Sequence, residues 1–267
     1  MPVTDSPDLR RPLDPERLAA ASPWHIELLP STPSTNAVAA ERARAGAAEG
    51  TVVVTEHQTA GRGRLDRTWE TPARSALTLS VVLRPPAEVP ASRWPWLPLA
   101  TGLAVARTLR ADPVGVEAGV KWPNDVLVED RKLCGILVER VETGLGPAAV
   151  VGIGLNTSLT REELPTGTAT SLLVERGAPV DRTDVLLALL AEFDAGHALW
   201  REAPDELAAA YRDASVTLGR LVRAELPGGR DLVGTATRIE DDGRVVIAHA
   251  EGETAVGAGD VVHLRPV

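Results

Sequence analysis

The stretch HQTAGRGRLDRTW, at positions 57–69, combines backbone freedom with positive charge. It carries two glycines and three arginines, at Gly61, Gly63, Arg62, Arg64 and Arg67. Glycine lets a backbone approach a ligand closely, and the forked guanidinium group binds phosphate or carboxylate oxygens in pairs. The spacing fits neither a P-loop nor a dinucleotide-binding fingerprint. Because neighbouring guanidinium groups repel one another, the stretch predicts a loop that orders around a polyanion or, alternatively, a solvated basic turn.

Lysine is confined to a second stretch, KWPNDVLVEDRKLCGILVE, although the chain has 28 basic residues. Lys121 and Lys132 are the only lysines, and each lies beside the end of an expected strand. Lysine and arginine differ in shape and hydration, so lysines kept in an arginine-rich chain indicate places where arginine would not serve. The turn at Pro123 exposes Asn124 and Asp125, and the Asp125 carboxylate could accept from a ligand or hold Mg²⁺ through water. Taken alone, either lysine would more often be an ordinary surface residue.

Asparagine and glutamine are as rare as lysine: the chain has three asparagines, Asn36, Asn124 and Asn156, and one glutamine, Gln58. Asn36 and Asn156 lie in two further stretches. In STN, Ser34, Thr35 and Asn36 begin an Ala-rich helix, whose capped N-terminus could bind a carboxylate or phosphate. In GIGLN, Gly152 and Gly154 alternate along a strand and leave one face of the sheet bare, which suits a flat ligand. The alternatives are a plain helix cap for the first stretch and a bulge or tight helix packing for the second.

Composition restricts the class of protein. The chain has 267 residues, of which 44% are hydrophobic and 24% charged, as is ordinary for a globular protein with a sizeable core. A net charge of −9 argues against a dedicated nucleic-acid binder, and no apolar run approaches the length of a membrane span. The single cysteine, Cys134, excludes an intrachain disulfide framework and a thiolate-rich metal site. Because the N-terminus has no signal-peptide core, a cytoplasmic enzyme is expected.

The elements that must position these residues alternate irregularly between helix and strand. Buried strands are expected at TVVVTEH and SALTLSVVLRP, and the adjacent strands KLCGILVERVE and AAVVGIGLNTS are joined by a hairpin turn. Amphipathic helices are expected at 94–111 and 181–203. After Tyr211, short strands alternate with turns, as in a small antiparallel barrel. We therefore predict an α+β chain with three parts: a flexible arm over 1–22, a catalytic domain over 23–213 and a small barrel over 214–267.

Taken together, six stretches resemble the biotin protein ligase family. They are STN, HQTAGRGR with its following R and W, KWPNDV, KLCGILVE, GIGLN and ATSLL, in the family's order and at its usual spacing. The resemblance covers about residues 23–267 and implies a mixed-sheet catalytic domain, related to lipoate ligases, with a C-terminal SH3-like barrel. It also implies a two-step reaction. Biotin and Mg-ATP form biotinyl-5′-AMP, and biotin then passes to a lysine of the biotin carboxyl carrier domain of acetyl-CoA carboxylase or a related acyl-CoA carboxylase.

The resemblance also implies roles for individual residues. It implies a biotin pocket formed by Ser34, Thr35, Asn36, Gln58, Gly61, Arg62, Gly63, Arg64, Lys132, Gly135 and Gly152. It implies ATP or adenylate contacts at Arg64, Arg67, Trp69 and Asn156. From the KWPND residues themselves we expect further nucleotide contacts at Lys121 and Asn124, with Mg²⁺ held at Asp125 through water. Lys132, Arg62 and Arg64 are the expected catalytic residues, because bound cations reduce the repulsion between a carboxylate and an α-phosphate.

The chain departs from the family pattern inside the loop. Asp66 stands where family members commonly have glycine, and Leu65 stands where they often have a polar or basic residue. Only about 22 residues precede the catalytic domain, too few for a winged helix-turn-helix, so a monofunctional ligase that binds no nucleic acid is expected. It is expected to be a monomer or a weak dimer. Two alternatives remain open: a lipoate or octanoate ligase of the same superfamily, and a biotin-sensing repressor without useful ligase activity.

Overall fold

The computed structural model describes residues 9–21, 23–64, 67–226, 230–257 and 260–263. The α-helices are α1 Pro15–Ala19, α2 Thr35–Arg44, α3 Trp96–Arg110, α4 Leu172–Arg176, α5 Arg182–Glu202 and α6 Pro204–Ala214, with a 3-10 helix at Ala91–Arg93. The strands are β1 His25–Leu29, β2 Thr51–Thr55, β3 Gly61–Arg62, β4 Thr68–Trp69, β5 Ala76–Leu83, β6 Gly119–Lys121, β7 Asp125–Val128, β8 Arg131–Val141, β9 Ala148–Asn156, β10 Leu221–Leu226, β11 Arg230–Ile239, β12 Val245–His249, β13 Gly252–Val256 and β14 Asp260–His263. Within this described part, none of the helices combines the length and apolar character that a bilayer crossing requires.

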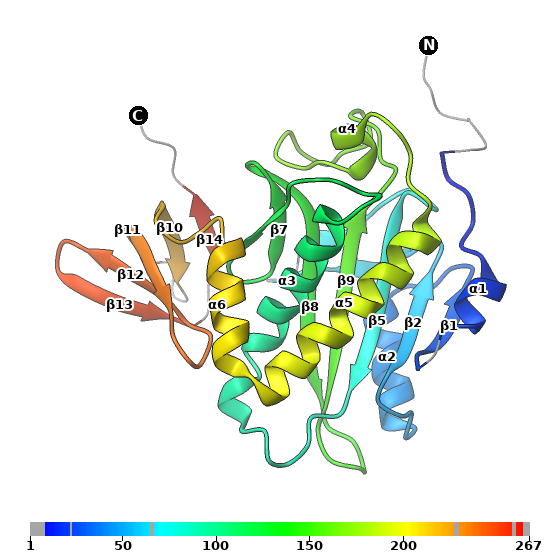
Figure 1. The fold of residues 1–267 in the computed structure, drawn as a ribbon, viewed down its shortest axis with the longest axis horizontal. Coiled ribbons are helices and arrows are strands. Elements are labelled where there is room, and N and C mark those ends of the chain that lie inside the picture. Colours follow the sequence, from blue (N-terminus) through cyan, green and yellow to red (C-terminus); the bar gives the residue numbers. More distant parts are fainter. Residues whose placement is uncertain (1–8, 22, 65–66, 227–229, 258–259, 264–267) are drawn as a thin grey trace.

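The central sheet has seven strands in the order β1-β2-β5-β9-β8-β7-β6 (Figure 1). The β1–β2 pair is parallel and every other neighbouring pair is antiparallel, so the sheet is mixed. The two strands predicted to be adjacent are β8 and β9, which pair from Cys134 with Leu155 to Val141 with Ala148. The predicted α+β class is therefore confirmed. Helices α4 and α6 were not predicted from the sequence.

The two faces of the central sheet have different covers, because side chains alternate along each strand. Helices α3 and α5 cover one face, where Leu77, Val151 and Leu155 belong to the main apolar core (Figure 1). Helix α2 covers part of the other face, where Val82 and Val150 pack with its alanines. Further along this second face the residues become small or polar, at Thr78, Ser80, Gly152 and Gly154. The second face therefore packs against α2 through apolar residues and leaves a hollow beyond the N-terminus of that helix.

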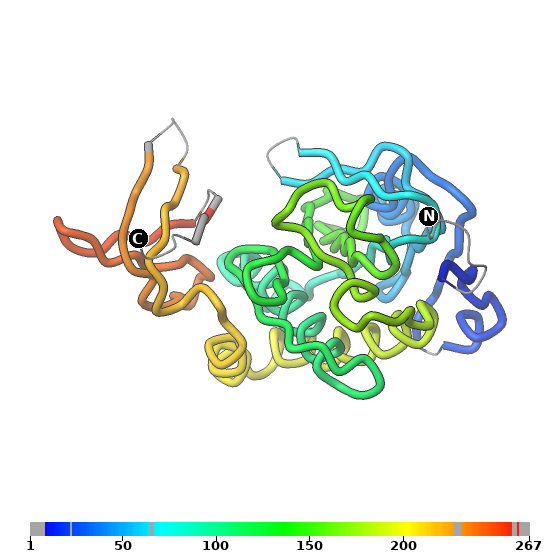
Figure 2. Tube along the Cα trace, turned by 90° about the horizontal axis from the view of Figure 1, so that it is seen from above, coloured from blue at the N-terminus to red at the C-terminus, as the bar shows by residue number. Residues whose placement is uncertain are grey.

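The C-terminal sheet has five antiparallel strands in the order β13-β12-β11-β10-β14. It lies beyond α6, at the end of the molecule opposite α1 (Figures 1 and 2). In the described part of the chain β13 and β14 are both edge strands, so the predicted barrel is open between them. Helix α6 ends at Ala214, beside the boundary expected from the sequence.

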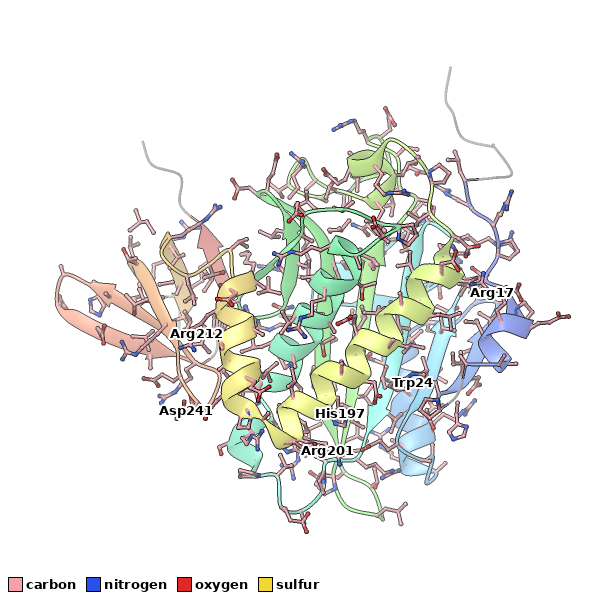
Figure 3. All side chains as sticks on the ribbon, in the orientation of Figure 1. Arg17, Trp24, His197, Arg201, Arg212 and Asp241 are labelled. Carbon is pink, nitrogen blue, oxygen red and sulfur yellow. The ribbon has the colours of Figure 1, made fainter. Side chains whose placement is uncertain are left out.

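Two tryptophans hold the C-terminal sheet against the catalytic domain. Trp96 Nε1 donates to Asp241 O at 2.8 Å, and Trp122 Nε1 donates to Gly243 O at 2.9 Å. Figure 3 shows Asp241 on the side of the C-terminal sheet that faces α6. Trp122 belongs to the KWPND motif, yet it is 2% exposed at this junction and takes no part in the cavity described below. Its motif position therefore reflects domain packing.

The segment before β1 is docked against the catalytic domain over its described residues. Leu13 and Leu18 are each 2% exposed, and Asp14 N donates to Thr183 Oγ1 at 3.0 Å. This differs from the flexible arm expected over 1–22, because the two leucines bury apolar surface that a free arm would expose. Residues 1–8 and 22 lie outside the described residues.

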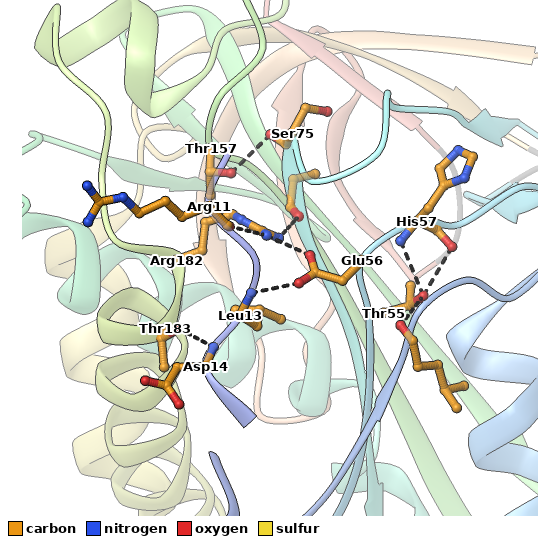
Figure 4. Close-up of polar contacts among 12 residues, drawn as sticks. Arg11, Leu13, Asp14, Thr55, Glu56, His57, Ser75, Thr157, Arg182 and Thr183 are labelled. Carbon is orange, nitrogen blue, oxygen red and sulfur yellow. Dashed lines mark hydrogen bonds and ion pairs between the residues drawn. The ribbon is translucent and has the colours of Figure 1, made fainter. Parts of the chain in front are cut away.

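Glu56 directly precedes residues 57–74, which are called the Gly-Arg loop from here on. It connects the docked N-terminal segment to the base of this loop (Figure 4). Its carbonyl accepts from Arg74 N at 2.7 Å, which brings the two ends of the loop together. Its carboxylate accepts from Leu13 N and from Arg182 Nη2, both at 2.6 Å. The side chains of Arg182 and Glu56 are only 2% and 11% exposed. Because the pair is removed from water, each charge depends on the other for compensation.

Arg182→Met should lower the free energy of unfolding by about 3–5 kcal/mol, because it leaves the Glu56 carboxylate buried without its counter-ion. Arg17→Met is the matched control, since Arg17 forms an exposed ion pair with Asp184, which lies near the start of α5 as Arg182 does. Solvent screens that pair, so the control should change stability far less. Urea unfolding followed by circular dichroism measures both. Equal losses in the two variants would contradict a special contribution from the buried pair.

Candidate functional site

A cavity of about 120 Å³ occupies the hollow on the second face of the central sheet. Strands β5, β8 and β9 form its floor, the N-terminus of α2 one end, and the Gly-Arg loop its cover. The predicted site residues that line it are Ser34, Thr35, Asn36, Gln58, Arg62, Gly63, Arg64, Arg67, Trp69, Asn124, Asp125, Lys132, Gly135 and Gly152. The structure therefore brings together, in one cavity, residues from all four stretches with rare polar side chains.

Helix α2 places three polar side chains at one end of the cavity. The sequence predicts a helix cap at Ser34 or Thr35, and Ser34 is the N-cap, which accepts a backbone N–H. Thr35 N donates to Gln58 Oε1 at 2.9 Å. Asn36 reaches onto the sheet above Gly152, where an added Cβ would come within 2.2 Å of Asn36 Oδ1. Gly152 is therefore required by the close approach of a side chain from α2.

The Gly-Arg loop folds back on itself as a hairpin formed by β3 and β4. Gly61 pairs with Trp69 in this hairpin. Gly61 does not line the cavity but lies beneath Gln58, because a Cβ there would come within 2.2 Å of Gln58 Nε2. Leu65 and Asp66, where the chain departs from the family pattern, lie outside the described residues.

The hairpin lays Trp69 flat against two paired glycines of the sheet. Gly135 of β8 and Gly154 of β9 are direct partners across the ladder. An added Cβ would lie 3.2 Å from Trp69 Cζ3 at Gly135 and 2.6 Å from Trp69 Cε2 at Gly154. From sequence, a flat ligand is expected on this bare face; the flat group found there is the chain's own indole. Its Nε1 is buried without a partner among the described residues, so it can donate to a ligand.

Charged and amide groups gather at the other end of the cavity. Lys132 Nζ lies 2.6 Å from Asp125 Oδ1, and Lys121 Nζ lies 4.0 Å from Asp125 Oδ2. Lys121 does not line the cavity and stands behind the carboxylate. Arg64 Nη1 donates to Asn124 Oδ1 at 3.1 Å, so the loop and the KWPND turn are in direct contact. Lys132 and Arg64 thus both line the cavity here, Lys132 held by its ion pair with Asp125 and Arg64 by its hydrogen bond to Asn124.

Asn156, one of the predicted site residues, supports Lys132 without facing the cavity. Asn156 is 4% exposed and donates Nδ2 to Thr170 O at 2.9 Å. Thr170 N in turn donates to Lys132 O at 2.9 Å, so Asn156 fixes the backbone around the lysine.

Cys134 is fully buried, and burial raises the pKa of its thiol, so it offers no reactive thiolate.

Six lining residues were not predicted from the sequence: Thr68, Thr78, Leu79, Ile136, Leu137 and Ile153. Gly154, which also lines the cavity, was expected only as part of a bare sheet face. Part of the signal is visible in β5, where alternate positions read Ala76, Thr78 and Ser80 against leucines and valine. The same alternation in β9 places glycines on one face and apolar residues on the other. Only the strand order shows that these small residues share a single face.

Two family models match the chain. Residues 28–156 match the Biotin/lipoate A/B protein ligase family, and residues 217–264 match the Biotin protein ligase C terminal domain. A biotin–[acetyl-CoA-carboxylase] ligase of Mycobacterium tuberculosis is 44% identical, over 98% of this chain and 100% of the relative. The bifunctional ligase/repressor BirA of Bacillus subtilis is 31% identical, over 85% of this chain and 70% of the relative.

Solved structures agree with these matches. The Aquifex aeolicus biotin protein ligase in complex with biotin and ATP has a TM-score of 0.77 at 27% identity, covering 91% of this chain and 99% of that chain. The Leishmania major enzyme in complex with biotinyl-5-AMP has a TM-score of 0.60 at 26% identity, covering 91% of this chain and 100% of that chain. The chain therefore belongs to the biotin/lipoate A/B protein ligase family and, within it, to the biotin protein ligases.

Proposed function

We propose that this chain forms biotinyl-5′-AMP from biotin and Mg-ATP and then transfers biotin to a lysine of a biotin carboxyl carrier domain. The observation that carries the proposal is one cavity with two different ends. Lys132 and Arg64 supply positive charge at one end, and the polar groups of α2 lie at the other. The relatives support it, because one is named a biotin–[acetyl-CoA-carboxylase] ligase and another holds biotin and ATP. The proposed acceptor is the carrier domain of an acyl-CoA carboxylase.

In the first step, a carboxylate oxygen of biotin attacks the α-phosphorus of ATP, and the bond from phosphorus to pyrophosphate breaks. Both reactants are anions, so cations must reduce their repulsion and stabilise the charge of the transition state. Lys132 suits this role because its ion pair with Asp125 fixes the direction of the ammonium group, while 36% of the side chain stays exposed. Arg64, held by Asn124, supplies a second cation, and Arg62 is proposed to assist from the same hairpin.

Magnesium would be held chiefly by the nucleotide. Among the described residues, Asp125 is the one carboxylate that lines the cavity, and these residues contain no cluster of three potential metal ligands. Mg²⁺ in nucleotide sites uses one or two carboxylates, substrate phosphates and several waters, so this donor set fits an ion that arrives with ATP. Such an ion screens the charge that develops on the leaving pyrophosphate.

In the second step, the amine of the carrier lysine attacks the acyl carbon of biotinyl-5′-AMP. The bond between that carbon and the AMP oxygen breaks, and the amine loses a proton as the amide forms. An acyl-adenylate is prone to hydrolysis, so the site must exclude water until the carrier arrives. The hairpin with Arg62 and Arg64, and the indole of Trp69, are proposed to retain the adenylate, with Arg67 on the nucleotide side.

Incubation of the full chain with biotin, Mg-ATP and an apo carrier domain tests the proposal. We expect a mass increase of one biotinyl group on one lysine of the carrier; a folded chain that gives no such increase would contradict it. Calorimetric titration with biotin and with lipoate separates it from a lipoate ligase. Sequence-specific operator binding at moderate salt would favour a repressor. Light scattering across a concentration series tests the proposed monomer or weak dimer.

Lys132→Ala should slow formation of biotinyl-5′-AMP by about 10²–10³-fold, the typical effect of removing one preorganised charge-stabilising group. Pyrophosphate release in single turnover measures this step without the carrier. Arg140→Ala is the control, because Arg140 is exposed further along the same strand and pairs with Glu142. Near-normal pyrophosphate release by the Lys132 variant would exclude the assigned role.

Arg64→Ala should increase the escape of biotinyl-5′-AMP into solution, because it removes both a cation and the contact between the loop and Asn124. We expect free adenylate, relative to biotinylated carrier, to rise about tenfold, as one charged hydrogen bond is lost. Chromatography of a quenched reaction measures that ratio. Arg44→Ala, on the exposed end of α2, should leave it unchanged. The same ratio in both variants would count against the loop as a cover.

Gly154→Ala should displace Trp69, because the new Cβ would lie 2.6 Å from the indole. We expect kcat/KM for ATP to fall at least about tenfold, since misplaced binding groups cost that much or more. Gly144→Ala is the matched control, because this glycine of the β8–β9 turn has no other atom within 4 Å of its Cβ position. Steady-state kinetics with a saturating carrier domain compares them. An unaffected Gly154 variant would show that Trp69 does not contribute to the nucleotide side.

A further inference from the structure

The polar end of the cavity contains a chain of hydrogen bonds whose direction is fixed from outside the cavity. Asn36 Nδ2 donates to Glu139 Oε2 at 2.6 Å and to Leu137 O at 3.3 Å. A carboxylate and a carbonyl can only accept hydrogen bonds. The NH₂ group of Asn36 must therefore face these two oxygens, and its Oδ1 must face the other way, toward Ser80. Glu139 is half-buried and does not itself line the cavity.

Ser80 passes this direction on to Thr35. The Ser80 hydroxyl is fully buried and lies 2.6 Å from Asn36 Oδ1 and 2.8 Å from Thr35 Oγ1. A hydroxyl group has one proton, and the acceptor Asn36 Oδ1 takes it. Toward Thr35, Ser80 can therefore only accept. The other neighbour of the Thr35 hydroxyl is Gln58 Oε1 at 3.2 Å, which is also an acceptor. The single proton of Thr35 is consequently used inside the protein.

The end of the cavity thus has a defined polarity. Thr35 Oγ1 can meet a ligand only as an acceptor, while Gln58, whose Oε1 faces Thr35 N, has its Nε2 donors left for other partners. A cyclic urea, with N–H donors beside a carbonyl oxygen, is complementary to this pair. Resting on the proposed function, we infer that Glu139 is a positioning residue for biotin. It holds Asn36, and through Ser80 it keeps Thr35 as the acceptor for a ureido N–H.

Two substitutions of nearly equal size test this role. In Glu139→Gln the side-chain amide oxygen can still accept from Asn36, whereas Glu139→Leu removes the acceptor; both variants remove the charge. Calorimetry should give a Kd for biotin within about threefold of the parent for Glu139→Gln and about tenfold higher for Glu139→Leu, the effect of one lost hydrogen bond. The Kd for ATP and kcat should remain unchanged in both. Glu142→Leu, 72% exposed just beyond the end of the same strand, is the control.

The possible outcomes separate the explanations. An unchanged biotin Kd in Glu139→Leu would overturn the inference. Equal weakening by the glutamine and leucine substitutions would also overturn it, because charge rather than acceptor capacity would then matter. A lower Tm with parallel losses in biotin binding, ATP binding and kcat would indicate a merely structural residue. If the parent chain itself bound no biotin, the proposed function would fail instead, and that result is distinct from the others.

A double variant tests the direct coupling between the two side chains. Asn36→Asp alone sets two carboxylates against each other across the 2.6 Å contact and should weaken biotin binding strongly. Adding Glu139→Gln lets the new amide donate to the new carboxylate, while Ser80 still donates to position 36. The double variant should therefore bind biotin at least about tenfold more tightly than Asn36→Asp alone, since close pairs couple. Additive losses would exclude a hydrogen bond between these positions as the source of the effect.

Discussion

Strands β5 and β9 are buried on both faces, β8 is half-buried on its second face, and the filling of this second face decides how the rest of the site is built. Protein interiors are close-packed, so a missing side chain on a buried sheet must be replaced by another group. At Gly152 the replacement is the amide of Asn36, and at Gly135 and Gly154 it is the indole of Trp69. The close contacts at these glycines therefore hold the start of α2 and the Gly-Arg loop in one position.

Electrostatic compensation is the second requirement of this architecture. A cavity for two anionic substrates needs cations, and a cation that is partly removed from water needs its own partner. Lys132 has Asp125, and Arg64 has the amide oxygen of Asn124. These partners orient the positive groups without covering them. At the base of the loop Arg182 and Glu56 compensate each other in a similar way, outside the lining of the cavity.

Support for the site comes from distant parts of the chain. The N-terminal segment reaches the loop through the bond from Leu13 N to Glu56. The segment after β9 reaches the lysine through Thr170, which Asn156 holds in place. Groups that must be placed accurately are thus attached to sheet strands and to each other. Such support reduces the freedom that binding would otherwise have to remove.

The sequence by itself determined many of the helices and strands and most of the residues that line the cavity. Its rare lysines, asparagines and glutamine marked the four stretches, and local patterns predicted a helix cap at Ser34 or Thr35 and the hairpin strands β8 and β9. Only the tertiary structure decided which residues share a face. It placed Trp69 on the glycines where a flat ligand was expected, and it placed Trp122 at the domain junction. Asn156, expected to contact the nucleotide, instead supports the backbone of Lys132 from outside the cavity. The physical reason is that local patterns follow from neighbours along the chain, whereas cavity lining depends on strand order and on which distant side chain fills each gap.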